Sequence, residues 1–362
     1  MSAPVAEDEV VLAVRGRVGV ISLNRPKALN AINLGMVRQI AAALDLWEHD
    51  QKIDAILIKS TSGRAFCAGG DVRAIGILPT AEARVAKGSD FFGEEFTLNR
   101  RINRLAKPYI SLIGGIAMGG GLGLTVHGSH RIVGDDVRMA MPETVLGYFP
   151  DIGATWFLNR CPGALGRYLA LVGPQIGAAD AVFSGLATHH VPTAAFDEIV
   201  QALVSAPALD AAKVDAIVSE YATKPQGGHF AERQGVVDAL FGQDDLEKVV
   251  EAVGQAGADT PWVEEAAKAL GRAAPMSLRA TWHRMLEGRG KSVEDVLIDD
   301  YRMALRMIAR DDFAEGVRAI LVDKDQNPKW SPSALSQTSV ADVEALLRPL
   351  VEDAARGDLV FG

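Results

Sequence analysis

Two acidic residues, Glu143 and Asp151, lie in a mostly apolar stretch, residues 140–153, with proline and glycine at its corners. Burial beside a second acid raises the pKa of a carboxyl group and suits it to proton transfer near neutral pH. The cluster Gly119-Gly120-Gly121 precedes this stretch, and a glycine-rich turn lets backbone N–H groups reach a developing oxyanion. These residues indicate chemistry at a carbonyl group. The alternative is that either acid is a surface residue near a helix N-terminus, where proline and acids are favoured.

A second glycine loop, Ala68-Gly69-Gly70, also follows a strand-like segment. If the two loops face each other, two N–H groups converge on one carbonyl oxygen. Paired glycine turns serve close packing equally well, so the spacing alone leaves both interpretations open.

Other chemistries find little support in the chain. The sequence contains no G-x-G-x-x-G, no G-x-x-x-x-G-K-[ST] and no G-x-S-x-G pattern, so dinucleotide binding, a phosphate loop and a serine nucleophile elbow are unsupported. The pair His189-His190 has no companion at metal-ligand spacing, and we expect no metal site. Cys67 lacks an identifiable partner base and is interpreted as a small buried thiol.

The elements that must position these residues alternate between strand and helix in the N-terminal half. Apolar runs predict strands, and apolar residues at three- and four-residue spacing predict helices. The predicted strands are 10–14, 18–23, 55–58, 109–113 and 131–133; helices are expected around 37–47, over much of 80–107, and from the glycine cluster onward. This order is typical of an α/β architecture. After about Pro192 the pattern becomes mainly helical, and Ser339 to Asp342 predicts the capped start of a final helix.

Composition limits the class of protein. The 362 residues carry a formal net charge of -9, which argues against general nucleic-acid binding. The uncharged stretch from Tyr109 to Val126 contains a small-xxx-small pattern but is rich in glycine, so we expect a buried strand and helix there and no membrane association. The two cysteines form no motif with each other, and the acidic first residues resemble no targeting signal, so we expect a cytoplasmic protein.

Three segments, Leu23–Ala31, Ala65–Asp71 and Gly119–Gly121, resemble the crotonase (enoyl-CoA hydratase/isomerase) superfamily. Within it the chain is most similar to the 3-hydroxyisobutyryl-CoA hydrolases. That closer resemblance is carried by segments 91–96, 118–124, 141–153 and 322–330, and it extends from about Val10 to Pro332.

The resemblance implies a crotonase-like ββα spiral core over residues 1–200 and a helical region over 201–362 that completes the fold. It also implies an acyl-CoA substrate, with CoA as part of that substrate, no separate cofactor, and a homotrimer or homohexamer, the assemblies common in the superfamily. The implied catalytic residues are Glu143 and Asp151, with the backbone N–H groups of Gly70 and Gly120 as an oxyanion hole. The implied substrate-binding residues are Lys27, Ala28, Leu29, Ala68, Asp71 and Glu95.

The chain also departs from its relatives. Gly123 stands where hydratases carry a second catalytic glutamate, and Asp151 stands where they have glycine. Water addition to a double bond needs both an acid and a base, so the pattern favours hydrolysis of 3-hydroxyisobutyryl-CoA, a step of valine catabolism. A hydratase or isomerase that uses Glu143 alone and a non-catalytic acyl-CoA-binding subunit are the alternatives. Ala154-Thr155-Trp156 replaces glycine expected in the hydrolases and leaves the exact acyl group open.

Overall fold

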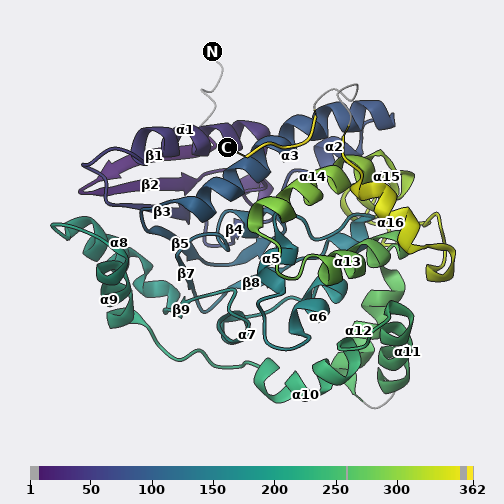
Figure 1. Ribbon diagram of the computed structural model, residues 1–362. Coiled ribbons are helices and arrows are strands. Elements are labelled where there is room, and N and C mark those ends of the chain that lie inside the picture. Colours follow the sequence, from purple (N-terminus) through teal and green to yellow (C-terminus); the bar gives the residue numbers. More distant parts are fainter. Residues whose placement is uncertain (1–7, 258–259, 351–356, 362) are drawn as a thin grey trace. The chain divides into compact units, whose positions relative to one another are not determined.

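A computed structural model describes residues 8–257, 260–350 and 357–361 of the chain (Figure 1). The chain forms two compact units, each assembled from separate stretches. The sheet unit comprises Met1–Gly70, Arg101–Met139 and Ile176–Gly228, and the helical unit comprises Asp71–Arg100, Ala140–Gln175 and His229–Gly362. The predicted domain boundary after residue 200 divides the chain at one point, whereas each compact unit combines three stretches. That boundary stays a prediction.

A six-stranded sheet forms the centre of the sheet unit, in the order β1-β2-β3-β5-β7-β9. Its strands are β1 (Val10–Arg15), β2 (Val18–Leu23), β3 (Ala55–Ser60), β5 (Tyr109–Ile113), β7 (His130–Val133) and β9 (His189–His190). A turn at Gly16, with φ of 55°, joins β1 and β2 as an antiparallel hairpin, and all later pairs are parallel. Parallel strands are normally covered on both faces, which explains the continuous apolar runs of β3 and β5.

Helices cover both faces of this sheet. Helix α1 (Leu34–Trp47) buries Val37, Ile40, Leu44 and Trp47, and the Trp47 ring occupies the space left by the missing side chain of Gly19 on β2. Val18 and Val20, which alternate with Gly19 along β2, pack instead with α8 (Phe196–Ser205) and α9 (Ala211–Tyr221). A short helix, α7 (Ala178–Phe183), precedes β9.

A smaller sheet in the order β4-β6-β8 positions the two glycine loops. Its strands are β4 (Ala65–Cys67), β6 (Ile116–Met118) and β8 (Arg138–Ala140). Because β4 and β6 run parallel, their carboxyl ends lie at the same edge of the sheet. Ala68–Gly70 follows β4 at that edge, and Gly119 follows β6 and leads into the short helix α4 (Gly120–Gly123).

The helical unit begins with α2 (Arg73–Gly76) and contains α3 (Ala81–Arg104) as far as Arg100. The other helices are α5 (Ala154–Leu158), α6 (Leu165–Val172), α10 (Phe230–Phe241), α11 (Leu246–Ala256), α12 (Pro261–Arg272), α13 (Pro275–Glu287), α14 (Val293–Ala309), α15 (Asp311–Val317) and α16 (Val340–Leu347). Helix α13 is buried along most of its length. The side chains of Ser292 and Ser339 cap the N-termini of α14 and α16.

The structure confirms the α/β class, the predicted strands and the mainly helical C-terminal half. The helix expected within 80–107 spans Ala81–Arg104, and the uncharged segment from Tyr109 contains β5, β6 and α4. Within the described residues, no helix combines the length and apolar character needed to cross a membrane.

Candidate active site

The two glycine loops lie next to each other in the sheet unit. A Cβ atom built on Gly69 would lie 3.2 Å from the Met118 carbonyl oxygen and 3.8 Å from the Gly120 nitrogen. Gly69 has φ of 113°, a conformation that side chains disfavour. A Cβ on Gly121 would lie only 2.4 Å from the Cys67 carbonyl oxygen. These glycines therefore serve the close approach of two loops.

The turn that contains Lys27, Ala28 and Leu29 is held against the glycine loop Ala68–Gly70. The Ala68 N–H donates to the Leu29 carbonyl at 3.0 Å, and the Ile32 N–H donates to the Gly69 carbonyl at 2.8 Å. The fully buried Asn30 side chain donates to the carbonyls of Ala65 and Phe66 and accepts from the Arg25 N–H. Asn30 thus couples the turn to β4.

Two backbone amides in these loops are free within the described part of the chain. Neither the Gly70 N–H nor the Gly120 N–H donates a hydrogen bond there. Gly120 is the first residue of α4, where helical geometry leaves N–H groups without an intrahelical acceptor. These amides are available for an acceptor oxygen from a ligand. Asp71 follows directly, partly buried, as the first residue of the helical unit.

Glu143 opens a short 3-10 turn, Glu143–Leu146, in the helical unit. Its neighbour Thr144 fixes this turn, accepting from the Ala274 N–H at 3.0 Å and donating from its hydroxyl to the Leu171 carbonyl at 3.3 Å. The Glu143 side chain is 7% exposed, and its Oε2 atom has no hydrogen-bond partner in the described residues. Burial raises the pKa of Glu143 well above its ordinary value, and the charge of nearby Asp151 raises it further.

Asp151 lies in a tight turn eight residues later and is 5% exposed. The Tyr148 hydroxyl donates to Asp151 Oδ2 at 3.1 Å. The next two residues, Ile152 and Gly153, have φ of 55° and 79°, and positive φ is costly for a β-branched residue such as Ile152. Burial, followed by the charge of Asp300, raises the pKa of Asp151 to about 8.

Glu95 reaches the same cluster from α3. It is 2% exposed, and its Oε1 atom has no hydrogen-bond partner in the described residues. Burial and then the charge of Asp151 raise the pKa of Glu95 well above its ordinary value. The charge of Asp151 acts on both glutamates. The three acids singled out from the sequence therefore lie close enough to interact.

Two residues that the sequence interpretation missed hold the Asp151 turn in place. Asp300 on α14 accepts from the Gly153 N–H at 2.8 Å and from Arg284 of α13 at 2.8 Å. Burial raises the pKa of Asp300 to about 6 although Arg284 and the Gly153 N–H oppose the rise. A signal was present in the sequence, because Asp300 lies among Val296, Leu297 and Tyr301 on the apolar face of a helix.

The acid cluster suits proton transfer. Glu95, Glu143, Asp151 and Asp300 are all buried with raised pKa values, and neighbouring buried carboxyl groups do not all ionise at neutral pH. Carboxyl groups whose pKa values are raised toward neutral pH suit the proton transfers of acid–base chemistry. No group of three or more His, Cys, Asp or Glu residues in the described ranges is placed to hold a metal ion.

Two further segments have structural roles: 322–330, which carries the resemblance, and Ala154-Thr155-Trp156, which departs from it. In 322–330, Asp323 and Asp325 bind Arg318 at 2.7 and 2.6 Å, so this acidic segment folds around an arginine. The Ala154-Thr155-Trp156 segment forms the first turn of α5, where the Trp156 ring packs against the Arg160 guanidinium at 3.8 Å.

The fold and these residues define a crotonase-type protein, and comparison with known families agrees. The chain belongs to the enoyl-CoA hydratase/isomerase family, whose model matches residues 18–347.

Two relatives illustrate the similarity within that family. A Xenopus tropicalis protein named 3-hydroxyisobutyryl-CoA hydrolase, mitochondrial, is 40% identical over 340 residues, which cover 92% of this chain and 87% of the relative. The Homo sapiens protein of the same name is 38% identical over 343 residues, covering 93% of this chain and 88% of the relative.

Solved structures confirm the crotonase-like fold. A structure titled carnitinyl-CoA dehydratase, from Mycobacterium thermoresistibile, has a TM-score of 0.88 at 37% identity and covers 96% of this chain and 98% of its own. One titled enoyl-CoA hydratase, from Rhodobacter sphaeroides, has a TM-score of 0.87 at 35% identity and covers 98% of this chain and 100% of its own.

The relatives contradict the cytoplasmic location expected from the sequence, because their names place them in mitochondria. That expectation was wrong because cysteine usage does not distinguish the cytoplasm from other reducing compartments. Cys67 and Cys161 are both free and buried, and reduced thiols fit any reducing compartment. The first seven residues, on which the expectation also rested, lie outside the described residues.

Proposed function

We propose that this protein hydrolyses 3-hydroxyisobutyryl-CoA to 3-hydroxyisobutyrate and CoA, and so acts in valine degradation. The observation that carries the proposal is the buried pair Glu143 and Asp151, found in a chain that is 37–40% identical over most of its length to proteins named for that hydrolysis. The names of the relatives indicate the substrate, and the two acids are suited to activating water.

The Gly70 and Gly120 amides take the role of an oxyanion hole in this proposal. Both N–H groups are free within the described residues, as an oxyanion hole requires. Donors directed at the tetrahedral oxyanion stabilise the transition state, each by about 3 kcal/mol in comparable enzymes. The thioester carbonyl oxygen would accept both hydrogen bonds as its carbon becomes tetrahedral.

Glu143 is the proposed catalytic carboxylate. As a general base it takes a proton from water while the water oxygen bonds to the thioester carbon. As a nucleophile it bonds to that carbon itself and forms an anhydride, which water then opens. In both routes the carbon–sulfur bond breaks, the thiolate of CoA leaves and takes up a proton, and the acid is released.

Asp151 is proposed to bind the substrate hydroxyl or to orient the water, and Glu95 to shape this polar end. Lys27, Ala28, Leu29 and Ala68 are proposed to line the path of the CoA moiety, and Asp71 is proposed as a further substrate-binding residue. In the sheet unit, Lys27, Ala28 and Leu29 follow one another in one turn, and the Ala68 N–H donates to the Leu29 carbonyl. No metal or redox cofactor takes part in the proposed reaction.

Purified protein with a panel of CoA thioesters tests the proposal. Release of free thiol from 3-hydroxyisobutyryl-CoA, at a rate proportional to enzyme, is the expected result. Tight binding of the thioesters without any turnover would overturn it and identify an acyl-CoA-binding subunit.

A hydratase is the second candidate, because the two similar solved structures are titled dehydratase and hydratase. Gly123, buried in α4, provides no carboxylate where the hydratases have their second acid. Loss of enoyl absorbance from crotonyl-CoA, faster than thiol release from the hydroxyacyl thioester, would favour this candidate. A trimeric or hexameric assembly stays a prediction for sedimentation or light scattering.

A further inference from the structure

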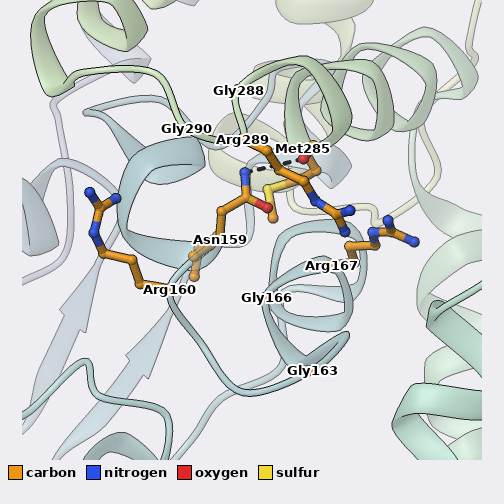
Figure 2. Close-up of a pocket in the computed structure, with 10 residues that line it drawn as sticks. Asn159, Arg160, Gly163, Gly166, Arg167, Met285, Gly288, Arg289 and Gly290 are labelled. Carbon is orange, nitrogen blue, oxygen red and sulfur yellow. Dashed lines mark hydrogen bonds between the residues drawn. The ribbon is translucent and has the colours of Figure 1, made fainter.

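A cavity in the helical unit has no part in the proposed chemistry. Its volume is about 500 Å³, and its walls come from the end of α5, the start of α6 and the end of α13 (Figure 2). Arg160, Arg167 and Arg289 are among the lining residues, which include no acid. This volume lies within the range of small-molecule sites, about 300–1,000 Å³.

Arg167 is the buried cation of this cavity. Its residue is 7% exposed, and its Nε atom has no hydrogen-bond partner in the described residues. One terminal nitrogen donates to the carbonyls of Phe241 and Gln243 at 3.2 and 2.9 Å, and the guanidinium packs against the Trp282 ring at 4.8 Å. The guanidinium is thus fixed in orientation while a buried donor remains unsatisfied, which is costly unless a ligand accepts from it.

Arg289 adds a second positive charge at the same place. Figure 2 shows the guanidinium of Arg289 directed toward that of Arg167, whereas Arg160 points the other way, over Trp156. The pKa of Arg167 is lowered by burial first and then by the charge of Arg289, with Asp244 opposing. Arg289 itself is exposed, so solvent and ligands reach it.

We propose that this cavity binds a phosphate group through Arg167 and Arg289. Two guanidinium groups match a phosphate dianion in charge, and the planar fork of arginine matches phosphate oxygens in geometry. The ligand source is either inorganic phosphate or a phosphate ester on a small metabolite such as a nucleotide.

Occupancy of the cavity would brace the elements that carry the acid cluster. Helix α5 begins three residues after Asp151, and α13 carries Arg284, which binds Asp300. The Asn159 side chain already joins these elements by donating to the Met285 carbonyl at 3.1 Å (Figure 2). A ligand held by Arg167 of α6 and by Arg289 beyond α13 would add a second connection and raise thermal stability.

Thermal melts and calorimetric titration test the proposal with two probes, inorganic phosphate and ribose 5-phosphate, a phosphate ester without the adenine of CoA. Chloride at matched ionic strength is the reference. We expect phosphate to raise Tm above the chloride value, and Arg289→Ala to weaken binding tenfold or more, because a charge-assisted hydrogen bond is lost. Arg272→Ala, which removes an exposed arginine from α12, should bind like the unmodified protein.

The two probes distinguish the two possible ligands, and two outcomes would contradict the proposal. Ribose 5-phosphate binding that is tighter than phosphate binding, and that Arg289→Ala weakens tenfold or more, identifies a phosphate ester as the ligand. Phosphate binding that is equal or tighter identifies the free ion. The proposal would be overturned if Arg289→Ala left the binding of both probes unchanged, or if neither probe raised Tm above the chloride value.

Discussion

The two halves of the proposed chemistry are built in different ways. In the sheet unit the functional atoms are backbone amides, placed by loops whose glycines allow contact at distances that a side chain would forbid. In the helical unit they are carboxyl groups on side chains, drawn from α3, the Glu143 turn and the Asp151 turn, with raised pKa values that burial produces. The amides depend on the position of the backbone, and the carboxyl groups depend on the burial and the charges around their side chains.

This difference predicts different responses to substitution. A backbone donor cannot be deleted by changing a side chain, and is lost only when the loop is displaced. A carboxylate can be neutralised with almost no change in shape. Substitution of a carboxyl side chain should therefore lower activity without lowering stability. Substitution of some glycines in the two loops should lower activity and stability together.

The largest effect is expected from Glu143→Gln. The amide keeps the volume of the side chain but neither accepts the proton of water nor attacks the thioester. We expect thioesterase turnover to fall by roughly 10²–10⁴-fold, with CoA binding retained. Glu287→Gln, at an exposed acid at the end of α13, serves as the control. Turnover close to that of the unmodified protein would remove Glu143 from the mechanism.

The next largest effect is expected from Gly120→Val. The side chain should crowd the thioester or displace the amide, and loss of one oxyanion donor costs on the order of 10²-fold in turnover. A thermal melt should show a much smaller effect on stability. Gly121→Ala is the matched contrast, because its Cβ would lie 2.4 Å from the Cys67 carbonyl oxygen and should lower Tm strongly. If unfolding accounts for all the lost turnover of Gly120→Val, the amide has no special role.

A smaller effect is expected on substrate choice. If Asp151 binds the substrate hydroxyl, a substrate without that group leaves a buried polar group unpaired, at a cost of about 1–3 kcal/mol. The specificity constant should favour 3-hydroxyisobutyryl-CoA over isobutyryl-CoA by roughly tenfold or more, and Asp151→Asn should reduce that ratio. Equal constants for the two substrates in the unmodified protein would limit Asp151 to handling water or protons.

The smallest effect concerns stability as a function of pH. Asp151 and Asp300 have pKa values raised to about 8 and about 6, so the folded protein holds protons that the unfolded chain has released. Their contribution to stability is present at low pH and is lost as pH rises from about 4 through these values. Asp300→Asn removes its own titration and lowers the pKa of Asp151, so the fall of Tm between pH 4 and 8 should be smaller.

Asp299→Asn is the control for that measurement. Asp299 also binds Arg284, at 2.7 Å. Its charge is absent from the causes that raise the pKa of Asp151 and comes last among those that act on the pKa of Asp300. A decline flattened equally by both substitutions would show that loss of the Arg284 pair, and not coupling to Asp151, is responsible.

The sequence singled out the acids and the glycine loops, whose catalytic roles stay predictions, and it missed residues that surround them. Apolar runs such as Ala55–Ile58 predict buried strands because burial on both faces leaves a continuous signal. Glu143 and Asp151 stood out as acids in an apolar stretch. Asp300 and Arg284 were missed because they lie on helices far along the chain, at no fixed spacing from Asp151, and only tertiary packing brings them to it. The sequence likewise could not predict that the Gly70 N–H is free, because this depends on every acceptor that the fold places near it.

The hydrogen bond from Gly153 to Asp300 also has a consequence for the order in which the protein is made. Its partners are separated by 147 residues, and ribosomes add about 5–20 residues per second. Roughly 7–30 s therefore pass between synthesis of the Asp151 turn and synthesis of the residue that anchors it. During that interval the nascent chain already carries Glu95, Glu143 and Asp151 but lacks the group that fixes the turn. Ribosome-bound chains that stop short of α14 should consequently be inactive, although every acid singled out from the sequence has already been translated.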